Sequence, residues 1–220
     1  MNTDGYVSIG RCEIDRTAQV CLGAVVGKPF RRLLDTEATE TQAEFTTHIG
    51  ANSYVGYYSV IGAGSSIADG VIIDDYCAIE GEVAVGHRSL VIYRAQICNE
   101  ARVGSGCVIG GFVAERVLIG DRVRLFGKIV HSQRDPTRAW DALDSAEESA
   151  IVEADAFVGF DALVAGKVVI GSKAYVCAGA IVTRDVPPGH VAYGVNKIVP
   201  AAEWKGPLCR SPFFQRRPAE

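Results

Sequence analysis

The sequence has no stretch of about 18 uninterrupted apolar residues, so it offers no candidate transmembrane helix. Its first residues lack a basic segment followed by an apolar run, and we therefore expect no secretory signal and a cytoplasmic protein. A strongly positive charge is also absent. The 220 residues carry a formal net charge of −4, which argues against a nucleic acid or a membrane surface as the main partner.

Closely paired cysteines are missing as well, although the chain contains seven cysteines. No two of them are separated by two residues, which is the spacing typical of structural zinc sites. Five fall at fixed places in the repeat described below: Cys21, Cys77, Cys98, Cys107 and Cys177. A reduced cysteine in such a place behaves as a small hydrophobic residue, so we predict free thiols that pack. Cys209 lies outside the repeat and has no assigned role.

The dominant feature of the sequence is a repeat of six residues. Every sixth position in one long stretch is Ile or Val: Ile49, Val55, Ile61, Ile67, Ile73, Ile79, Val85, Val91, Ile97, Val103 and Ile109. Helical faces recur at three and four residues and simple strands at two, so neither explains this spacing. Four residues after most of these Ile and Val residues, which we call the interior positions, stands a small or branched residue, for example Ser53, Ser59 and Cys77.

A unit of six residues cannot bury its own apolar side, so successive units must stack and share one interior. Three units would close one coil of a triangular prism, which makes residues eighteen apart neighbours along its axis. Val85 would then stack on Ile67, and Ile67 on Ile49. Gly, Asn and Asp near the corners tolerate the backbone angles that corners require. A prism this short has open ends and sides, so we expect self-association.

The repeat begins earlier, in a short run that a first break interrupts. Ile14, Val20 and Val26 are spaced by six and predict about one coil. Residues 28–45 then break the pattern with a proline, two arginines and an acidic, Thr-rich segment. We predict a loop here, or a loop with a short helix, that projects from the prism.

A second break interrupts the C-terminal half. After Ile109 the count of six slips and restarts from Val113. It continues through Ile119 and Leu125, and the interior position after these falls on His131. Residues 132–150 carry no repeat and predict an excursion loop, and loops on rigid scaffolds are where function concentrates. The repeat then resumes at Val152 for two more coils.

We expect the repeat to end at Val186–Gly189, because this segment contains two prolines and proline cannot donate to the next strand. Residues 201–220 form a tail with a short helix expected around Ala201–Lys205. The tail also holds an apolar pair, Phe213–Phe214, which we expect to cap the last coil or to pack on a neighbouring subunit.

The segment Ala178–Pro188 resembles the terminal signature of the hexapeptide-repeat acyltransferases. The likeness extends upstream to a His, an excursion loop and then Phe157–Gly159, and it is nearest the galactoside and xenobiotic acetyltransferase type. The resemblance implies an all-β fold, a left-handed parallel β-helix over residues 1–200, followed by the tail at 201–220. It also implies a homotrimer that uses acetyl-CoA or another acyl-CoA as co-substrate, with no tightly bound cofactor and no metal.

The resemblance also implies a binding site for coenzyme A in the terminal coils. Ala178 and Gly179 would border the pantetheine arm, while Thr183 and Arg184 would lie toward the adenosine end. Lys197 is placed to meet a phosphate. The general base of these enzymes is a histidine at the start of an excursion loop, and this place is occupied here by the histidine at position 131.

A histidine suits the chemistry of acyl transfer. The acceptor hydroxyl or amine must lose its proton as it attacks the thioester, and imidazole is poised for this work near neutral pH. The alternative role for His131 is a structural histidine that fills an interior position. His48, His87 and His190 lie next to strands or corners, and we expect each of them to be an exposed or capping residue.

The expected function is therefore acyl transfer from acyl-CoA to a small acceptor with a hydroxyl or amine, such as a sugar or a sugar nucleotide. A γ-type carbonic anhydrase uses the same prism but holds zinc with three histidines, and the four histidines here are widely spaced. A non-catalytic scaffold is the other alternative, and it would need neither His131 nor the excursion loop. The acceptor cannot be read from the sequence, because two subunits and both excursions would form its pocket.

Overall fold

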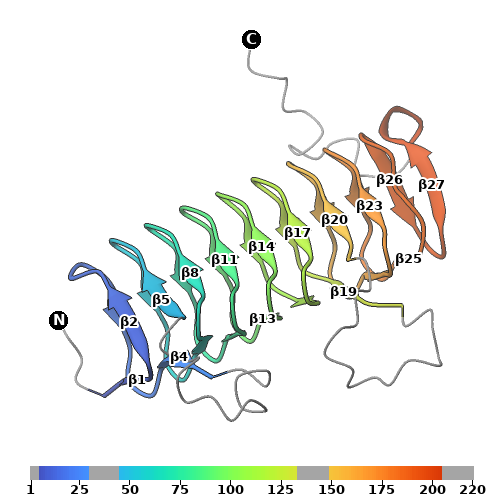
Figure 1. Ribbon diagram of the computed structural model, residues 1–220. Coiled ribbons are helices and arrows are strands. Elements are labelled where there is room, and N and C mark those ends of the chain that lie inside the picture. The colour runs from blue at the N-terminus through green and yellow to red at the C-terminus, as the bar shows by residue number, and fades with distance from the viewer. Residues whose placement is uncertain (1–4, 30–44, 133–148, 205–220) are drawn as a thin grey trace, which may run out of the picture.

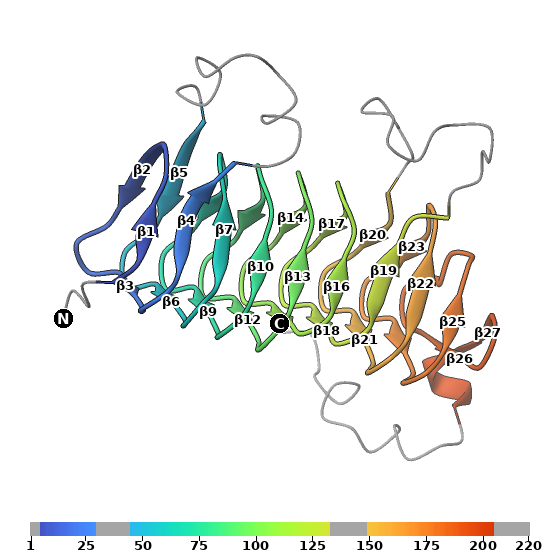
Figure 2. The same ribbon diagram turned by 90° about the horizontal axis from the view of Figure 1, so that it is seen from below.

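The computed structural model describes residues 5–29, 45–132 and 149–204, and short strands wind there into one elongated prism (Figure 1). Each coil contributes one strand to each of three sides, so that three sheets run along the prism. Figure 2 shows the strands of one side lying next to one another like the rungs of a ladder. Neighbouring strands are parallel throughout, with one exception at the C-terminal end.

We name the three sheets A, B and C in the order in which the chain visits them. Sheet A contains β1 (Val7–Ser8), β4 (Val25–Lys28), β7 (Val60–Gly62), β10 (Ala78–Ile79), β13 (Gln96–Ile97), β16 (Phe112–Val113), β19 (Lys128–Val130), β22 (Leu163–Ala165) and β25 (Ile181–Val182). Sheet B contains β2 (Arg11–Ile14), β5 (Thr46–Ile49), β8 (Ser66–Ile67), β11 (Ala84–Val85), β14 (Arg102–Val103), β17 (Leu118–Ile119), β20 (Ile151–Val152) and β23 (Val169–Ile170). Sheet C contains β3 (Gln19–Val20), β6 (Tyr54–Val55), β9 (Ile72–Ile73), β12 (Leu90–Val91), β15 (Val108–Ile109), β18 (Arg124–Leu125), β21 (Phe157–Val158), β24 (Tyr175–Val176), β26 (His190–Tyr193) and β27 (Lys197–Pro200). The corners between the sheets form three long edges, which we call the A–B, B–C and C–A edges.

The interior of the prism is a stack of aliphatic side chains from equivalent places in successive coils. Ile67 pairs in register with Val85, and Val85 pairs with Val103, as the spacing of eighteen predicts. All eleven interior positions from Ile49 to Ile109 are at most 4% exposed. The predicted register of this stretch is therefore confirmed.

Buried serines join successive coils by hydrogen bonds. The Ser53 hydroxyl donates to the Ala68 carbonyl oxygen at 2.8 Å and accepts from the Val71 N–H at 3.2 Å. The same two bonds are made at later corners by three further serines: Ser59, Ser65 and Ser89. A buried hydroxyl with both a donor and an acceptor partner avoids the penalty of an unsatisfied polar group. These small residues therefore connect the coils as well as fill space.

Most corners contain one residue with a left-handed backbone. Ten such positions, spaced by six from Asn52 to Gly106, have φ between 54° and 73°. Three of the ten are glycine, and most of the others are bulky, including Tyr58 and Tyr76. Their N–H groups bond to the preceding coil; that of Tyr76, for example, donates to the Tyr57 carbonyl oxygen at 2.9 Å. Left-handed backbone costs an ordinary residue about 1–2 kcal/mol, so the repeating geometry overrides local preference at these corners.

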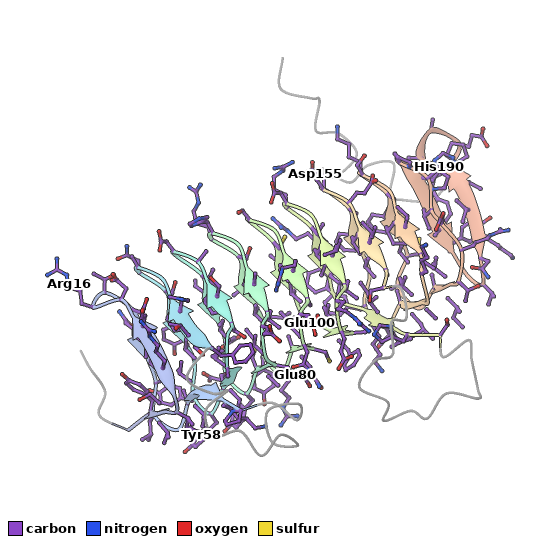
Figure 3. The ribbon with its side chains drawn as sticks, in the orientation of Figure 1. Arg16, Tyr58, Glu80, Glu100, Asp155 and His190 are labelled. Carbon is purple, nitrogen blue, oxygen red and sulfur yellow. The ribbon has the colours of Figure 1, made fainter. Side chains whose placement is uncertain are left out.

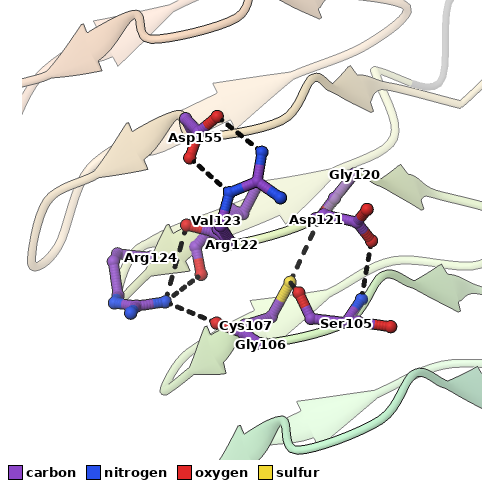
Figure 4. Close-up of polar contacts among 9 residues, drawn as sticks. All are labelled: Ser105, Gly106, Cys107, Gly120, Asp121, Arg122, Val123, Arg124 and Asp155. Atoms are coloured by element: carbon purple, nitrogen blue, oxygen red, sulfur yellow. Dashed lines mark hydrogen bonds and ion pairs between the residues drawn. The ribbon is translucent and has the colours of Figure 1, made fainter. Parts of the chain in front are cut away.

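Charged side chains tie the coils together along the B–C edge (Figure 4). Arg122 donates to both carboxylate oxygens of Asp155 at 2.7 and 2.8 Å, which raises the pKa of its guanidinium. Arg124 donates to the Gly106 carbonyl oxygen at 2.7 Å. The charged residues of this edge therefore make contacts within the scaffold.

The register prediction fails at residue 131. The restart at Val113 is correct, and Val113 stacks on Ile97 sixteen residues earlier. The next coil is shortened in the same way, so that Ile129, which is fully buried, takes the interior position that was assigned to His131. The corners can shorten because Gly111 and Gly127 approach closely: a Cβ on Gly111 would lie 1.8 Å from the Gly127 carbonyl oxygen.

The repeat also continues past the two prolines, contrary to the predicted end. Val186 forms a bridge with Ile170, and β26 then pairs with β24 as a further strand of sheet C. The prolines occupy the corner between these two pairings, where their missing N–H groups break no ladder bond. β27 pairs antiparallel with β26, and the expected helix is a short 3₁₀ turn, Ala201–Glu203. Phe213–Phe214 and the rest of the tail lie outside the described residues.

Both breaks in the repeat occur at the A–B edge. The chain leaves sheet A after β4 and returns in β5, and it does so again between β19 and β20. The predicted conformations of residues 30–44 and 133–148 lie outside the described residues. Within the described ranges, no helix has the length and hydropathy needed to span a membrane.

Six cysteines lie in the described part of the chain, and all six are free thiols. Cys77 and Cys107 are buried beside the interior aliphatic stack, as predicted for small packing residues. Burial raises the pKa of Cys77 to about 11, so its thiol stays protonated at neutral pH. Cys209 is outside the described residues.

The interior register can be tested with two matched substitutions. Ile97→Asp should unfold or aggregate the protein, because an unpaired carboxylate in the apolar interior costs several kcal/mol. Ile151→Asp is the control, since that side chain is 40% exposed on the outer face of sheet B. We expect the control to melt within about 5 °C of the wild type in circular dichroism, as surface substitutions do. An Ile97→Asp variant that melts like the control would show that the register is wrong.

The shortened corner makes a second prediction. Gly111→Ala should destabilise the protein by more than about 2 kcal/mol, because its methyl group would collide with a backbone oxygen that cannot rotate away. Gly10→Ala is the control: its φ is +67° but no atom lies within 4 Å of the new Cβ, so only the left-handed backbone costs about 1 kcal/mol. Urea unfolding compares the two. Equal losses would mean that the corner at Gly111 is not closely packed.

Candidate active site

His131 lies at the A–B edge, directly after β19, where the chain leaves the prism. It is half-buried, and Val130 before it still belongs to the ladder because its carbonyl oxygen accepts from the Gly166 N–H at 2.9 Å. The excursion returns beside it, where the Ser149 hydroxyl donates to the Glu115 carbonyl oxygen at 2.7 Å. His131 therefore lies outside the interior stack, at the base of the excursion, and its Nε2 atom is buried.

Two carboxylates line the A–B edge in the coils before His131. Asn99 joins them, because its N–H donates to Glu80 at 3.2 Å and its side-chain amide donates to Glu115 at 3.3 Å. Figure 3 labels Glu80 and shows it at the side of the prism. Burial, together with the charges of Glu80 and Glu115, raises the pKa of Cys98 to about 12, so this thiol is not a nucleophile. The sequence analysis did not identify this network, although all three members follow interior positions by one or two residues.

The residues expected beside pantetheine lie on the C–A edge. Ala178 and Gly179 are exposed in the corner between β24 and β25. Gly179 has φ +68°, and its N–H donates to the Phe160 carbonyl oxygen at 2.9 Å. A Cβ at Gly179 would meet no atom within 4 Å. In a single chain, this part of the expected donor site is an open, convex corner.

The residues expected near the adenosine end are gathered on the other side of β25. Asn196 accepts from the Thr183 N–H at 2.8 Å and donates to the Thr183 hydroxyl at 2.9 Å. The Arg184 guanidinium donates to the Asn196 carbonyl oxygen, and Lys197 is the next residue in the chain. The Lys197 ammonium lies 5.8 Å from the centre of the Tyr193 ring. Asn196 thus holds Thr183 and Arg184 beside β25, and the sequence analysis did not identify it.

Except for Lys197, which begins β27 of sheet C, the predicted site residues border sheet A, but they do not form one cluster within the chain. Thr183 and Arg184 share the A–B edge with His131 and lie two strands further on, because β19, β22 and β25 are neighbours (Figure 2). Two strand spacings correspond to about 10 Å. Ala178 and Gly179 lie at the opposite edge of the same sheet.

The other three histidines lie at the surface, as expected. His48 points outward from sheet B with its Nδ1 atom 3.1 Å from a Glu13 carboxylate oxygen, beside a shallow pocket of about 530 Å³. The Nδ1 atom of His87 lies 4.0 Å from an Asp69 carboxylate oxygen. The Nδ1 atom of His190 lies 2.9 Å from the Pro188 carbonyl oxygen. Among the residues that the structure describes, no three His, Cys, Asp or Glu side chains are grouped so that they could hold a metal ion.

Comparison with known proteins identifies the fold class. The chain has a TM-score of 0.68 to a UDP-N-acetylglucosamine acyltransferase from Francisella novicida, with 17% identity over 91% of this chain and 69% of that one. For the Campylobacter jejuni enzyme of the same name the TM-score is 0.64, with 15% identity over 90% of this chain and 73% of that one. This likeness confirms the predicted all-β fold, a left-handed parallel β-helix.

Sequence similarity is confined to a short segment. Bifunctional protein GlmU from Polaromonas naphthalenivorans is 36% identical over 58 residues, which are 26% of this chain and 12% of that protein. This chain therefore matches only a small part of that relative. No family model matches the chain.

Proposed function

We propose that this protein is an acyltransferase that moves an acyl group from acyl-CoA to a hydroxyl or amine of a small acceptor, such as a sugar or a sugar nucleotide. The observation that carries the proposal is the arrangement around β25. Exposed Ala178 and Gly179 lie on one side of this strand, while Thr183 and Arg184 bond to Asn196, the residue before Lys197, on the other. The acyltransferase activity named for two proteins of the same fold is consistent with it.

The two cations suit the anionic end of coenzyme A. Arg184 is exposed after β25, the last strand of sheet A, and its bond to the Asn196 carbonyl oxygen holds the guanidinium in place; Lys197 is exposed at the start of β27. A guanidinium binds phosphate with paired N–H donors, and an ammonium supplies a compact charge. Across β25, the exposed backbone around Gly179 leaves room for the slender pantetheine arm to pass close to the chain.

His131 acts as the general base in this proposal. As the acceptor oxygen or nitrogen attacks the thioester carbonyl carbon, the imidazole takes the acceptor's proton. The carbon–sulfur bond then breaks, and the imidazolium returns the proton to the departing thiolate, so that the products are the acylated acceptor and free coenzyme A. Backbone N–H groups at a corner would stabilise the oxyanion that forms during the attack.

The role of His131 makes a kinetic prediction. His131→Ala should fold and bind coenzyme A, because Ile129 rather than His131 fills the interior, yet kcat should fall by about 10²-fold or more. His131→Asn should be no better, because an amide cannot take the proton. Release of free thiol from acetyl-CoA, screened against amino sugars, sugar nucleotides and small alcohols, measures the rate. The pH dependence of the wild-type kcat/KM should include an ionisation that both variants lose.

Two outcomes would contradict this role. If His131→Ala keeps the wild-type turnover, the base lies elsewhere or the protein is a non-catalytic scaffold. If the variant loses its fold while the folded fraction turns over normally, His131 is a structural residue.

The donor site makes a separate prediction. Arg184→Glu should raise the KM for acetyl-CoA at least about tenfold with a smaller effect on kcat, as expected when binding shared by ground and transition states is lost. Lys173→Glu is the matched control, because Lys173 is an exposed cation on the B–C edge, away from sheet A. Equal KM values for the two variants would place the phosphates elsewhere.

A further inference from the structure

The outward side chains of sheet B change in character along the prism. One row in strand register begins with Glu13, His48 and Ser66, in β2, β5 and β8. It continues through Ala84 and Arg102, in β11 and β14, and Figure 1 shows these strands following one another along the prism. The last places of the same row are aliphatic: Leu118, Ile151 and Val169. Polar residues are therefore gathered at the N-terminal end of this face.

His48 stands in the middle of three register partners. Neighbouring strands lie about 4.8 Å apart, so Glu13, His48 and Ser66 are adjacent side chains on one face. The Nδ1 atom of His48 lies 3.1 Å from a Glu13 carboxylate oxygen. This contact leaves Nε2 as the ring nitrogen for the opposite side of β5, where β8 carries Ser66. A carboxylate at Nδ1 favours the tautomer with its proton on Nδ1 and its lone pair on Nε2.

Ser66 differs from the serines that join the coils. The hydroxyl of its neighbour Ser65 is buried and bonds to the next coil. Ser66 is exposed, and within the described ranges its hydroxyl has no hydrogen-bond partner. A serine hydroxyl is a weak nucleophile until an adjacent base takes its proton. A carboxylate, an imidazole and a serine hydroxyl in this order are the arrangement that activates serine on several unrelated folds.

A pocket of about 530 Å³ opens beside this row, and its size suits a small ligand. His48 and Ser66 line it together with Ala84 and Arg102. The small side chain of Ala84 leaves space between the serine and the arginine. The Arg102 guanidinium donates to the Glu82 carbonyl oxygen, which holds it at the far end of the pocket. The pocket thus places a cation opposite the exposed hydroxyl.

The pocket also has an apolar wall. Phe45 lines it directly before β5, and its ring lies so close to Gly64 that a Cβ there would come within 2.8 Å of a ring carbon. Gly64 also has φ of +73°, so a side chain at this position would be strained as well as crowded. Aromatic surface next to a nucleophile and a cation suits a substrate with a short acyl chain and a polar carbonyl group.

A structural role does not account for the pairing of Glu13 with His48. Both side chains are about half exposed, and exposed ion pairs contribute little to stability. The chain offers a comparison on the B–C edge, where the His87 Nδ1 atom lies 4.0 Å from an Asp69 carboxylate oxygen. Ser105 follows His87 by eighteen residues. This second set has the same residue types, but its His–carboxylate distance exceeds that of a hydrogen bond.

We propose that Glu13, His48 and Ser66 form a second catalytic site, which hydrolyses small acyl esters. The Ser66 Oγ atom attacks the ester carbonyl carbon while the His48 Nε2 atom takes the hydroxyl proton. The bond to the leaving alcohol then breaks, and the imidazolium gives its proton to that alcohol. Water attacks the acyl group on Ser66, again with His48 as the base, and the products are a carboxylic acid and the free serine. Glu13 orients the imidazole, and Arg102 donates to the oxyanion in both steps.

This site is separate from the one proposed for acyl transfer. His131 lies between β19 and β20, and β20 is four strands from β8 in sheet B. Four strand spacings correspond to roughly 19 Å. The ester reaction uses neither coenzyme A nor the residues around β25. Either activity can therefore be absent without affecting the other.

Hydrolysis of p-nitrophenyl acetate tests the proposal. Ser66→Ala and His48→Ala should release p-nitrophenol about 10²-fold more slowly than the wild type while keeping its circular dichroism, because both side chains are exposed. Ser105→Ala and His87→Ala are the matched controls and should keep the wild-type rate. A wild type no faster than Ser66→Ala, or an equal loss in the controls, would overturn the proposal. A rate that falls in His131→Ala but not in Ser66→Ala would assign the hydrolysis to the other site.

A covalent probe gives a second measurement that does not depend on turnover. A fluorophosphonate forms a bond to an activated serine oxygen as fluoride leaves, and peptide mass spectrometry then locates the modified residue. We expect the label on Ser66. Glu13→Gln should slow the labelling at least about tenfold, because the amide orients the imidazole less well than the carboxylate does. A label on another residue, or an unchanged labelling rate in Glu13→Gln, would refute the assigned roles.

Discussion

The fold depends on one recurring constraint. Each short strand must place a branched aliphatic side chain in the interior, and the chain must then turn a corner before the next strand begins. Because strand side chains alternate between the two faces, a slip of one residue would turn an interior side chain outward. The chain therefore absorbs irregularities at corners. Gly111 and Gly127 allow two coils to shorten by two residues each, and Val113 and Ile129 still reach the interior. The buried serine hydroxyls hold neighbouring coils in the same register.

This constraint leaves the corners as the places where the chain can vary, and equivalent corners line up along the prism. The three edges consequently differ in chemistry. Ion pairs such as Arg122–Asp155 connect coils along the B–C edge. The A–B edge contains both breaks in the repeat, His131 and Arg184 of the proposed donor site. Tyrosines occupy left-handed corners of the C–A edge, where glycine or asparagine would be less strained. Strained positions are often retained where they serve binding or catalysis.

The sequence was sufficient for the parts of the fold that repeat. Ile or Val at every sixth position identified the interior, and the same count located both breaks. It failed at His131, because shortening at Gly127 depends on a backbone contact with Gly111, sixteen residues away, that no local pattern reveals. The candidate site was predicted by family resemblance rather than by spacing. Asn196, which holds Thr183 and Arg184, was missed because nothing in its neighbourhood repeats.

The two halves of the proposed active site differ in how the fold positions them. The donor residues flank β25, and His131 lies on the same edge as Arg184 two strands away, so backbone spacing alone sets their separation. No side chain of the interior needs to change for this geometry to persist. The acceptor, by contrast, would meet the segments at 30–44 and 133–148, whose sequences do not follow the repeat of six. Substitutions there can alter the acceptor without affecting the coils. A prism of this kind can therefore keep one donor and one base while its acceptor changes, which is why the sequence specifies the donor half of the site and leaves the acceptor open.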